Sequence, residues 1–359
     1  MLINRRNQVP HVEWRYMDVA VLGAGLVGNW IVKTLASQGF RVVAIDSDPS
    51  AIKKLENIAD TFQQNVDEEL IKSLDVKVFV NALPGRIGHK IRKILLESGT
   101  KIADLAFTPE DPREMDEIAK KHESCLIYDV GVAPGLSNLL LKEANRRHGK
   151  LTMGRVRVGG NPSISDGQWS YMAPFSPIDV IEEYTRPARI IRNGEIIKLP
   201  ALSERELFHV EGRGEMEAFL TDGLRSVLDT VDADELTEAT VRWPGHIDMY
   251  IQNKDKLTES ELIDAWAWDS KKSEFTWMEV LAQGKGSARW ILDDEGTQGG
   301  SSMARTTGAI TCAVVKYLLE EETPIGIYPP ECISSDLLLR CTNEYALHGI
   351  KLIDENQSF

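Results

Sequence analysis

The glycine-rich segment Val19–Gly28 restricts the fold of this chain more than any other part of the sequence. It reads Val-Ala-Val-Leu-Gly-Ala-Gly-Leu-Val-Gly, and Asp46 closes the next apolar run, residues 42–45. This order predicts a buried strand, a tight turn, a helix and an acid at the end of a second strand. The pattern is typical of a unit that holds a dinucleotide. The alternative is a degenerate unit of the same fold that binds nothing.

Each residue type in this segment has a physical role in holding a dinucleotide. Gly23 permits the tight turn, Gly25 lets the backbone approach a pyrophosphate, and Gly28 lets the helix pack close to the strand. The phosphates would lie at the helix N-terminus, where free N–H groups and the helix dipole favour anions. A carboxylate at position 46 bonds the adenosine ribose and repels a 2′-phosphate, so NAD is favoured over NADP. The contacts predicted in this unit are Gly23, Gly25, Leu26, Val27, Gly28 and Asp46.

Charge and apolar patterning exclude several classes of partner. The formal net charge is −14 and no basic patch stands out, which argues against nucleic acid and anionic membranes. No apolar run approaches the roughly 18 residues of a membrane span, and the N-terminus lacks the apolar region of a signal peptide. The four cysteines show no metal-ligand spacing, so no metal is expected. We therefore expect a cytoplasmic protein that acts on a small molecule.

Two patterns of secondary structure divide the chain. Strands alternate with helices from residue 18 to residue 129, which predicts a doubly wound parallel sheet, the Rossmann form of the α/β class. Beyond Lys150 the strands are irregularly spaced, which predicts a second, mixed α/β domain with a largely antiparallel sheet. We expect the NAD-binding domain at residues 1–131, completed by about 300–359. We expect a substrate-binding and dimerisation domain at residues 132–299.

The ends of the chain fit this plan less clearly. Residues 1–17 form a polar, aromatic-containing lead-in to which we assign no element. Residues 303–319 predict a strong helix after a Gly-Gly-Ser-Ser start, and residues 325–330 predict an extended turn.

Polar or glycine-rich residues follow three of the predicted parallel strands, where ligands bind in doubly wound sheets. Asp104 ends an apolar strand, and its carboxylate could hold an ammonium or take a proton; the alternative is a solvated strand-end acid or a helix cap. The other two segments have simpler alternatives, a strand-to-loop stop and a domain hinge. The cofactor contacts predicted at these strand ends are Asn81, Ala82, Leu83, Pro84, Asp104, Gly131, Val132 and Ala133.

Three further positions in the second half could carry chemistry. His246 follows a strand and a Pro-Gly turn, although a histidine in such a turn is usually a surface residue. Arg225 lies close to Asp222 and could anchor an α-carboxylate as a bidentate partner; a surface ion pair explains the two residues equally well. The segment Met303–Thr307 opens a helix and could present N–H groups or hydroxyls to an anion, or serve as a helix cap.

Taken together, these motifs resemble the saccharopine dehydrogenase family, and within it the L-lysine 6-dehydrogenases. The resemblance runs from about residue 18 to residue 335. It implies a Rossmann domain completed by C-terminal residues, a second α/β domain that holds the substrate and mediates dimers, and a nicotinamide cofactor. The matching segments are Val21–Gly28, Val80–Leu83, Asp104–Leu105, Asp129–Gly135, Val158–Gly160, Pro187–Gly194, Glu217–Phe219, Thr240–Arg242, Gly245–His246, Met303–Thr307 and Gly326–Glu331.

The sequence thus predicts an NAD-dependent enzyme that oxidises an amino acid, with L-lysine at its 6-position as the leading substrate. We expect Asp104 or His246 to accept the proton and Arg225 to anchor the carboxylate. The chain departs from the family pattern after Leu83 and after Leu105, which leaves the amino acid open. One alternative is a reductase of the saccharopine or carboxynorspermidine type, which should need more arginines around its pocket. Another is a protein that binds NAD for regulation without catalysis.

Overall fold

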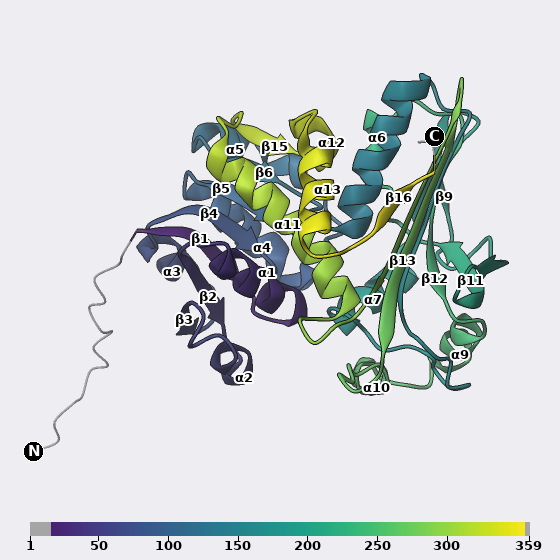
Figure 1. Ribbon diagram of the computed structural model, residues 1–359, viewed down its shortest axis with the longest axis horizontal. Helices are drawn as coiled ribbons and strands as arrows, with labels where there is room; N and C mark the ends of the chain where they lie inside the picture. The colour runs from purple at the N-terminus through teal and green to yellow at the C-terminus, as the bar shows by residue number, and fades with distance from the viewer. Residues whose placement is uncertain (1–15, 356–359) are drawn as a thin grey trace, which may run out of the picture.

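The computed structural model describes residues 16–355 and contains two β-sheets that lie beside one another (Figure 1). The predicted lead-in, residues 1–17, lies outside the described residues except at its last two positions. The purple and blue part of the chain forms most of the first sheet and its helices, the green part forms most of the second sheet, and the yellow C-terminal part contributes to both. The predicted class, a Rossmann sheet plus a mixed α/β domain, is confirmed.

Seven parallel strands form the first sheet, in the order β15-β6-β5-β4-β1-β2-β3. The chain runs outward from β1 to β3 and then returns to β4 to run the other way. The carboxyl ends of β1 and β4 therefore meet at the switch point where such sheets bind ligands. The strands are β1 (Met17–Leu22), β2 (Val42–Asp46), β3 (Asp60–Gln63), β4 (Val76–Asn81), β5 (Lys101–Asp104), β6 (Cys125–Ile127) and β15 (Gly326–Tyr328).

Helices cover both faces of this sheet, as the apolar side chains on both faces of a parallel sheet require. Successive residues of β1 point to opposite faces. Val19 and Val21 belong to one core cluster, with α1 and α11, whereas Ala20 and Leu22 belong to another, with α4. The helical segments of this half are α1 (Leu26–Ser37), α2 (Pro49–Lys53), α3 (Glu68–Ser73), α4 (Gly85–Glu97), η1 (Pro112–Met115), α5 (Asp116–Lys121), α11 (Ser302–Glu320), α12 (Pro330–Ile333) and α13 (Leu337–Leu347).

The second sheet is mixed and mainly antiparallel. Only the β12–β7 pair among its described strands is parallel, and the order is β10-β11-β12-β7-β13-β14-β16, with β8 and β9 attached beside β12. Its strands are β7 (Met153–Pro162), β8 (Ala188–Arg192), β9 (Glu195–Leu199), β10 (Glu206–Val210), β11 (Gly214–Leu220), β12 (Leu236–Arg242), β13 (Glu274–Gln283), β14 (Ser287–Glu295) and β16 (Leu352–Asp354). Its helical segments are η2 (Val132–Leu136), α6 (Ser137–His148), α7 (Pro177–Thr185), α8 (Val227–Thr230), α9 (His246–Asn253) and α10 (Glu259–Ala265).

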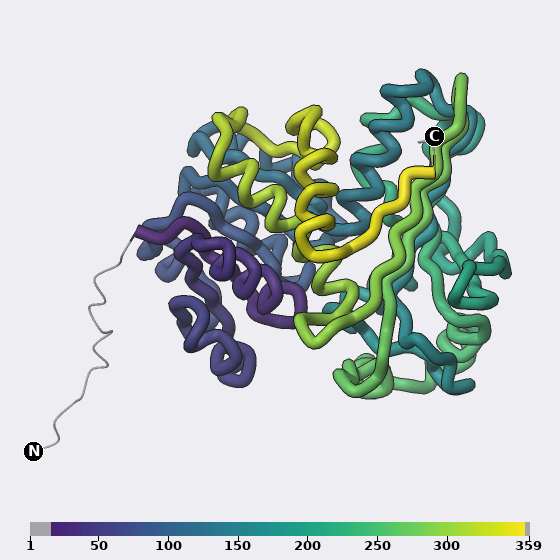
Figure 2. The backbone as a smooth tube through the Cα atoms, viewed as in Figure 1, coloured from purple at the N-terminus to yellow at the C-terminus, as the bar shows by residue number. Residues whose placement is uncertain are grey.

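The C-terminal part of the chain connects the two sheets. After β14 the chain returns to the first sheet through α11, whose Gly308 lies against Trp30 of α1; a Cβ at Gly308 would lie 2.3 Å from the indole ring. The predicted extended turn at residues 325–330 contains instead the edge strand β15, which pairs with β6. The chain then crosses back, and β16 pairs with β14 of the second sheet (Figure 2). Within residues 16–355, no helix combines the length and apolarity needed to cross a bilayer.

Candidate active site

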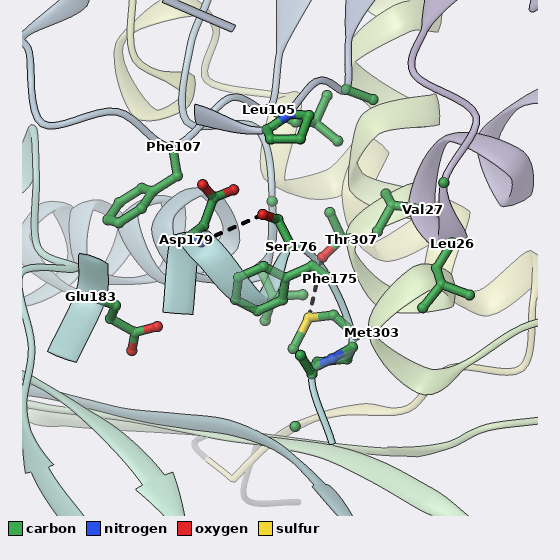
Figure 3. A pocket seen from close by; sticks show the side chains of 18 of the residues that line it. Leu26, Val27, Leu105, Phe107, Phe175, Ser176, Asp179, Glu183, Met303 and Thr307 are labelled. Carbon is green, nitrogen blue, oxygen red and sulfur yellow. Dashed lines mark hydrogen bonds between the residues drawn. The ribbon is translucent and has the colours of Figure 1, made fainter. Parts of the chain in front are cut away.

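A cavity of about 650 Å³ opens at the carboxyl ends of β1 and β4 and extends toward the second sheet. Figure 3 shows Leu26 and Val27 of α1 on one side of it, and Asp179 and Glu183 of α7 on the other. Met303 and Thr307, near the start of α11, also border the cavity. The cavity thus combines residues from both halves of the molecule, and its two ends have different chemistry.

The N-terminal end of α1 borders the cavity with free hydrogen-bond donors. Gly25 caps this helix with no side-chain hydrogen bond, and Asn29 N donates to the Gly25 carbonyl oxygen at 2.9 Å. The three preceding N–H groups, those of Leu26, Val27 and Gly28, therefore have no partner within the helix. Such a helix end, after a glycine turn, is suited to a phosphate group.

The glycines of the turn meet the steric demands of a dinucleotide site. Gly23 has φ +94°, and a Cβ there would lie 2.7 Å from the Ala82 carbonyl oxygen. A Cβ at Gly28 would lie 1.9 Å from the Gly23 carbonyl oxygen, so the helix could not pack this closely with any other residue. A Cβ at Gly25 would meet no atom within 4 Å. Because Gly25 lines the cavity, this open space is available for a pyrophosphate, and the site fits the cofactor.

Asp46 ends β2 and supports the same turn. Its Oδ2 accepts a hydrogen bond from Ala24 N at 2.6 Å, and its Oδ1 accepts one from Asp48 N at 2.8 Å. The carboxylate also borders the cavity. Since each carboxylate oxygen has a further lone pair, Asp46 can still accept hydrogen bonds from a ribose.

Most of the predicted cofactor contacts line the cavity, but Asn81 and Asp104 do not. Asn81 is fully buried, and its Nδ2 donates to the Gly88 carbonyl oxygen at 3.2 Å and to Asp104 Oδ1 at 3.0 Å. The predicted residues that line the cavity are Gly23, Gly25, Leu26, Val27, Gly28, Asp46, Ala82, Leu83, Pro84, Gly131, Val132 and Ala133.

The environment of Asp104 differs from the one expected for a proton acceptor. The side chain is 0% exposed and forms an ion pair with Arg92, whose Nε lies 2.5 Å from Asp104 Oδ2. Ala106 N donates to Asp104 Oδ1 at 2.9 Å. Burial raises the pKa of the Asp104 carboxyl, and the Arg92 guanidinium opposes that shift. With its oxygens bonded inside the first domain, Asp104 has a structural role in place of the predicted chemical one.

The predicted carboxylate anchor, Arg225, is directed toward another part of the protein. Its Nε lies 2.9 Å from Asp129 Oδ2, and its Nη1 donates to the Thr108 carbonyl oxygen at 2.8 Å. Both members of this ion pair are buried, and only Asp129 lines the cavity. Arg225 therefore joins the loop after β11 to the loop after β6, which corrects its predicted role.

His246 is also buried, in an aromatic cluster beside the cavity. Its Nε2 lies 3.1 Å from Tyr184 Oη, and its Nδ1 lies 2.8 Å from the Trp169 carbonyl oxygen. Burial, together with the positive charge of Arg242, lowers the pKa of His246 to about 3. Both ring nitrogens have protein partners and the residue does not line the cavity. The predicted proton acceptance by His246 is therefore not supported by its position.

Four charged residues that the sequence argument did not select as catalytic form the far end of the cavity: Asp179, Glu183, Glu238 and Arg242. Glu238 Oε2 lies 2.8 Å from Thr221 Oγ1 and accepts from Gly223 N at 3.0 Å. Asp179 accepts from Gly85 N at the start of α4, at 3.2 and 3.3 Å. Carboxylates therefore dominate this end.

Arg242 is the one basic residue among the described residues that line the cavity. Its Nε donates to Tyr184 Oη at 2.8 Å, and its Nη1 donates to the Val241 carbonyl oxygen at 2.9 Å. Its guanidinium lies over the Tyr171 ring, 4.5 Å from the centroid. These contacts hold a buried cation at a fixed place in the cavity lining, where its charge interacts with Glu183.

Burial raises the pKa values of two of these acids toward neutral pH. The pKa of Glu238 is raised to about 8, first by burial and then by the neighbouring Glu183 carboxylate. The pKa of Asp179 is raised to about 6 by burial, against the hydrogen bond from Gly85 N. Buried acids with raised pKa values in a cavity are typical of sites that transfer protons.

A sequence signal for part of this group exists in the strand β12. Glu238, Thr240 and Arg242 alternate with Ala239 and Val241, so three polar side chains share one face of the strand. Charged side chains on one face of a central strand indicate either a site or buried ion pairs. No comparable local signal points to Glu183, which reaches the cavity from α7.

Comparisons with known proteins agree with this geometry. The model of the saccharopine dehydrogenase C-terminal domain matches residues 131–350, and that of the NAD binding domain of 3-hydroxyacyl-CoA dehydrogenase matches residues 18–84. Mouse (Mus musculus) mitochondrial alpha-aminoadipic semialdehyde synthase is 22% identical over 196 residues, which are 50% of this chain and 21% of that protein. The chain thus spans about a fifth of the length of that relative.

A solved structure extends the likeness to nearly the whole chain. Apo saccharopine dehydrogenase (L-Glu forming) from Saccharomyces cerevisiae superposes with a TM-score of 0.72 at 15% identity, over 94% of this chain and 99% of that one. At this identity the superposition shows a shared fold. The C-terminal family model matches more than half of the chain, so the chain belongs to the saccharopine dehydrogenase family and carries a nicotinamide-dinucleotide-binding domain.

Proposed function

We propose that this protein oxidises the 6-amino group of L-lysine with NAD. The observation that carries the proposal is the charge pattern at the far end of the cavity, where the lining holds three acids, Asp179, Glu183 and Glu238, and a single cation, Arg242. L-Lysine has two ammonium groups and one carboxylate, which complements this pattern. Saccharopine has three carboxylates, and one arginine among several acids would leave two of them without a cationic partner.

The cofactor end of the cavity supports a dinucleotide without a 2′-phosphate. The free N–H groups of α1 would hold the pyrophosphate, and Asp46 would bond the ribose hydroxyls. A bound nicotinamide would supply a hydride acceptor for the carbon that carries the amino group. The protein must in turn hold that amine in place, remove its proton and exclude water.

The test is NADH formation from NAD by the purified protein at alkaline pH, measured by absorbance. L-Lysine, saccharopine, carboxynorspermidine and 1,5-diaminopentane are compared at equal concentrations. We expect turnover with L-lysine and none with saccharopine. Faster turnover with saccharopine or carboxynorspermidine would replace this proposal with the reductase alternative. NADH binding without turnover of any amine would favour the regulatory alternative.

We expect Asp46→Ser to weaken NADH binding by about 10- to 100-fold, because a hydrogen bond to a charged group contributes about 1.5–3 kcal/mol. The affinity for NADPH should stay level or rise, since the carboxylate no longer repels the 2′-phosphate. Fluorescence titration of both cofactors measures the two dissociation constants. Asp60→Asn, which removes a charge from an exposed position on β3, is the control. Unchanged NADH affinity in Asp46→Ser would contradict the ribose contact.

We expect Arg242→Gln to raise the KM for L-lysine by about 10- to 100-fold, through loss of a charged hydrogen bond to the substrate carboxylate. The KM for 1,5-diaminopentane, which is L-lysine without its carboxylate, should change much less. Steady-state kinetics with both substrates measure this difference. Arg205→Gln serves as the control, because Arg205 is on the same half but outside the cavity lining. An equal rise in both KM values would show that Arg242 only supports the fold.

A further inference from the structure

Four side chains at the far end of the cavity form a continuous chain of hydrogen bonds. Thr221 Oγ1 lies 2.8 Å from Glu238 Oε2 and 2.8 Å from Thr240 Oγ1. Thr240 Oγ1 in turn bonds to Glu183 Oε1. Thr221 follows β11, Glu238 and Thr240 belong to β12, and Glu183 belongs to α7. All four side chains line the cavity, so the chain connects two carboxyl groups that a substrate can approach.

The number of protons in this chain follows from its geometry. Three contacts between oxygen atoms need three protons, and the two threonine hydroxyls supply only two. If both carboxyls were ionised, each hydroxyl would donate to its own carboxylate. The Thr221 and Thr240 oxygens would then face one another at 2.8 Å with no proton between them. One protonated carboxyl removes this conflict, because all three hydrogen bonds can then point in the same direction.

The surroundings favour the shared proton at the Glu238 end. Glu238 is 4% exposed and faces the carboxylates of Glu183 and Asp222, and burial raises its pKa to about 8. Glu183 is less buried and interacts with the positive charge of Arg242. The other titratable groups that face Glu183 are the hydroxyls of Tyr171 and Tyr184, and Asp179 lies one turn earlier on α7. Glu183 is therefore the end of the chain that accepts a hydrogen bond, from Thr240.

We propose that Glu183 accepts the proton of the substrate ammonium, and that Glu238 holds a second proton and orients Glu183 through Thr221 and Thr240. This inference rests on the proposed oxidation of an amine. In the step, one N–H bond of the ammonium breaks and an O–H bond forms on Glu183, while the electron pair stays on nitrogen. The amine becomes neutral, as it must before the neighbouring carbon can lose a hydride. Glu183 is thus the catalytic residue and Glu238 the positioning residue.

The variants Glu183→Gln and Glu238→Gln should differ in activity, which a purely structural role of both residues does not predict. We expect Glu183→Gln to lower kcat by about 100-fold or more, the range for loss of a general base. Its rate should rise at high pH as the free amine becomes available from solution. Glu238→Gln should lower kcat less than Glu183→Gln does, because an amide N–H can donate to Thr221 as the protonated acid does, although the amide nitrogen cannot accept from Gly223 N. Its pH profile should lose the ionisation that belongs to Glu238. Equal losses in both variants, with unchanged pH profiles, would overturn the assignment.

Matched variants distinguish the loss of the hydrogen-bonded chain from a general disturbance of the fold. Thr240→Ser keeps the hydroxyl and should retain activity, whereas Thr240→Val should lower kcat by about tenfold or more, since it removes one hydroxyl link. Glu215→Gln, an exposed position on β11, should have no effect. NADH affinity, measured by fluorescence, should be the same in all of these proteins. Equal activity of Thr240→Val and Thr240→Ser would contradict a role for this chain of hydrogen bonds.

A measurement without turnover separates this inference from the proposed function. Infrared difference spectra at neutral pH should show one protonated-carboxyl band that is absent from Glu238→Gln. The same band should be absent from Glu183→Gln, because the glutamine then supplies the missing donor and Glu238 ionises. If no amine is oxidised but the band behaves in this way, the proposed function fails and the shared proton stands. If neither variant loses a band, the shared proton is wrong, whatever the substrate.

Discussion

Gly25→Ala should lower the affinity for NADH by about 10²- to 10⁴-fold and leave the apoprotein nearly as stable as the parent. The added methyl group meets no protein atom within 4 Å, and Gly25 has φ −61°, outside the left-handed region that favours glycine. The methyl group would occupy the space into which a pyrophosphate must fit. Displacing two hydrogen bonds to charged oxygens costs about 3–6 kcal/mol, from about 1.5–3 kcal/mol each. Fluorescence titration and thermal unfolding measure the two quantities.

Gly28→Ala provides the informative contrast to this variant. Its methyl group would lie 1.9 Å from the Gly23 carbonyl oxygen, so the helix must move and the apoprotein itself should lose stability. Lys33→Ala, at an exposed position on the same helix, should change neither quantity. If Gly25→Ala bound NADH normally, the pyrophosphate could not lie at the start of α1.

Arg92→Met should reduce the free energy of unfolding by about 3–5 kcal/mol, the range for removing one partner of a buried ion pair. Arg92 is 0% exposed and donates to Asp104 Oδ2 at 2.5 Å and to the Ala106 carbonyl oxygen at 2.9 Å. The variant leaves the Asp104 carboxylate buried without its cation. Equilibrium denaturation in urea measures the loss.

Two further variants test the interpretation of this ion pair. The Arg113 side chain is 40% exposed and pairs with Asp111 and Asp229. Arg113→Met breaks these surface pairs, and it should lower the free energy of unfolding by less than about 1 kcal/mol. Combining Arg92→Met with Asp104→Leu should recover part of the lost stability, because the uncompensated charge is gone. A cost no greater than that of Arg113→Met would show that Asp104 is not charged when buried.

The fold and the cofactor end of the cavity were predictable because their signals are local. Gly23, Gly25, Gly28 and Asp46 lie within one βαβ unit, and backbone sterics and strand order fix their relative positions. The edge strand β15 was missed for the opposite reason. It is three residues long, and its pairing with β6 joins positions about 200 residues apart in the sequence. A strand this short is too short to show the alternation of apolar and polar residues by which strands are recognised.

The substrate end could not be predicted in the same way, because partners from distant segments decide what each residue does. The sequence suggests that Asp104 is a free strand-end acid, but in the structure it pairs with Arg92 of α4. His246 looked like a turn histidine, yet Tyr184 and Trp169 enclose it. Glu183 reaches Thr240 from an element with no recognisable motif. Burial and side-chain pairing of this kind depend on tertiary contacts, which a local sequence pattern does not reveal.

The return of the chain between its two sheets has a consequence for synthesis on the ribosome. β6 obtains its outer neighbour only when residues 326–328 have emerged, and β14 obtains β16 only with residues 352–354. Until then β6 and β14 each have one side without a partner strand, the kind of surface that pairs with other nascent chains. Trp30, made early, likewise waits for Gly308. Residues 308–354 must therefore be made before β6, β14 and Trp30 are covered by their partners.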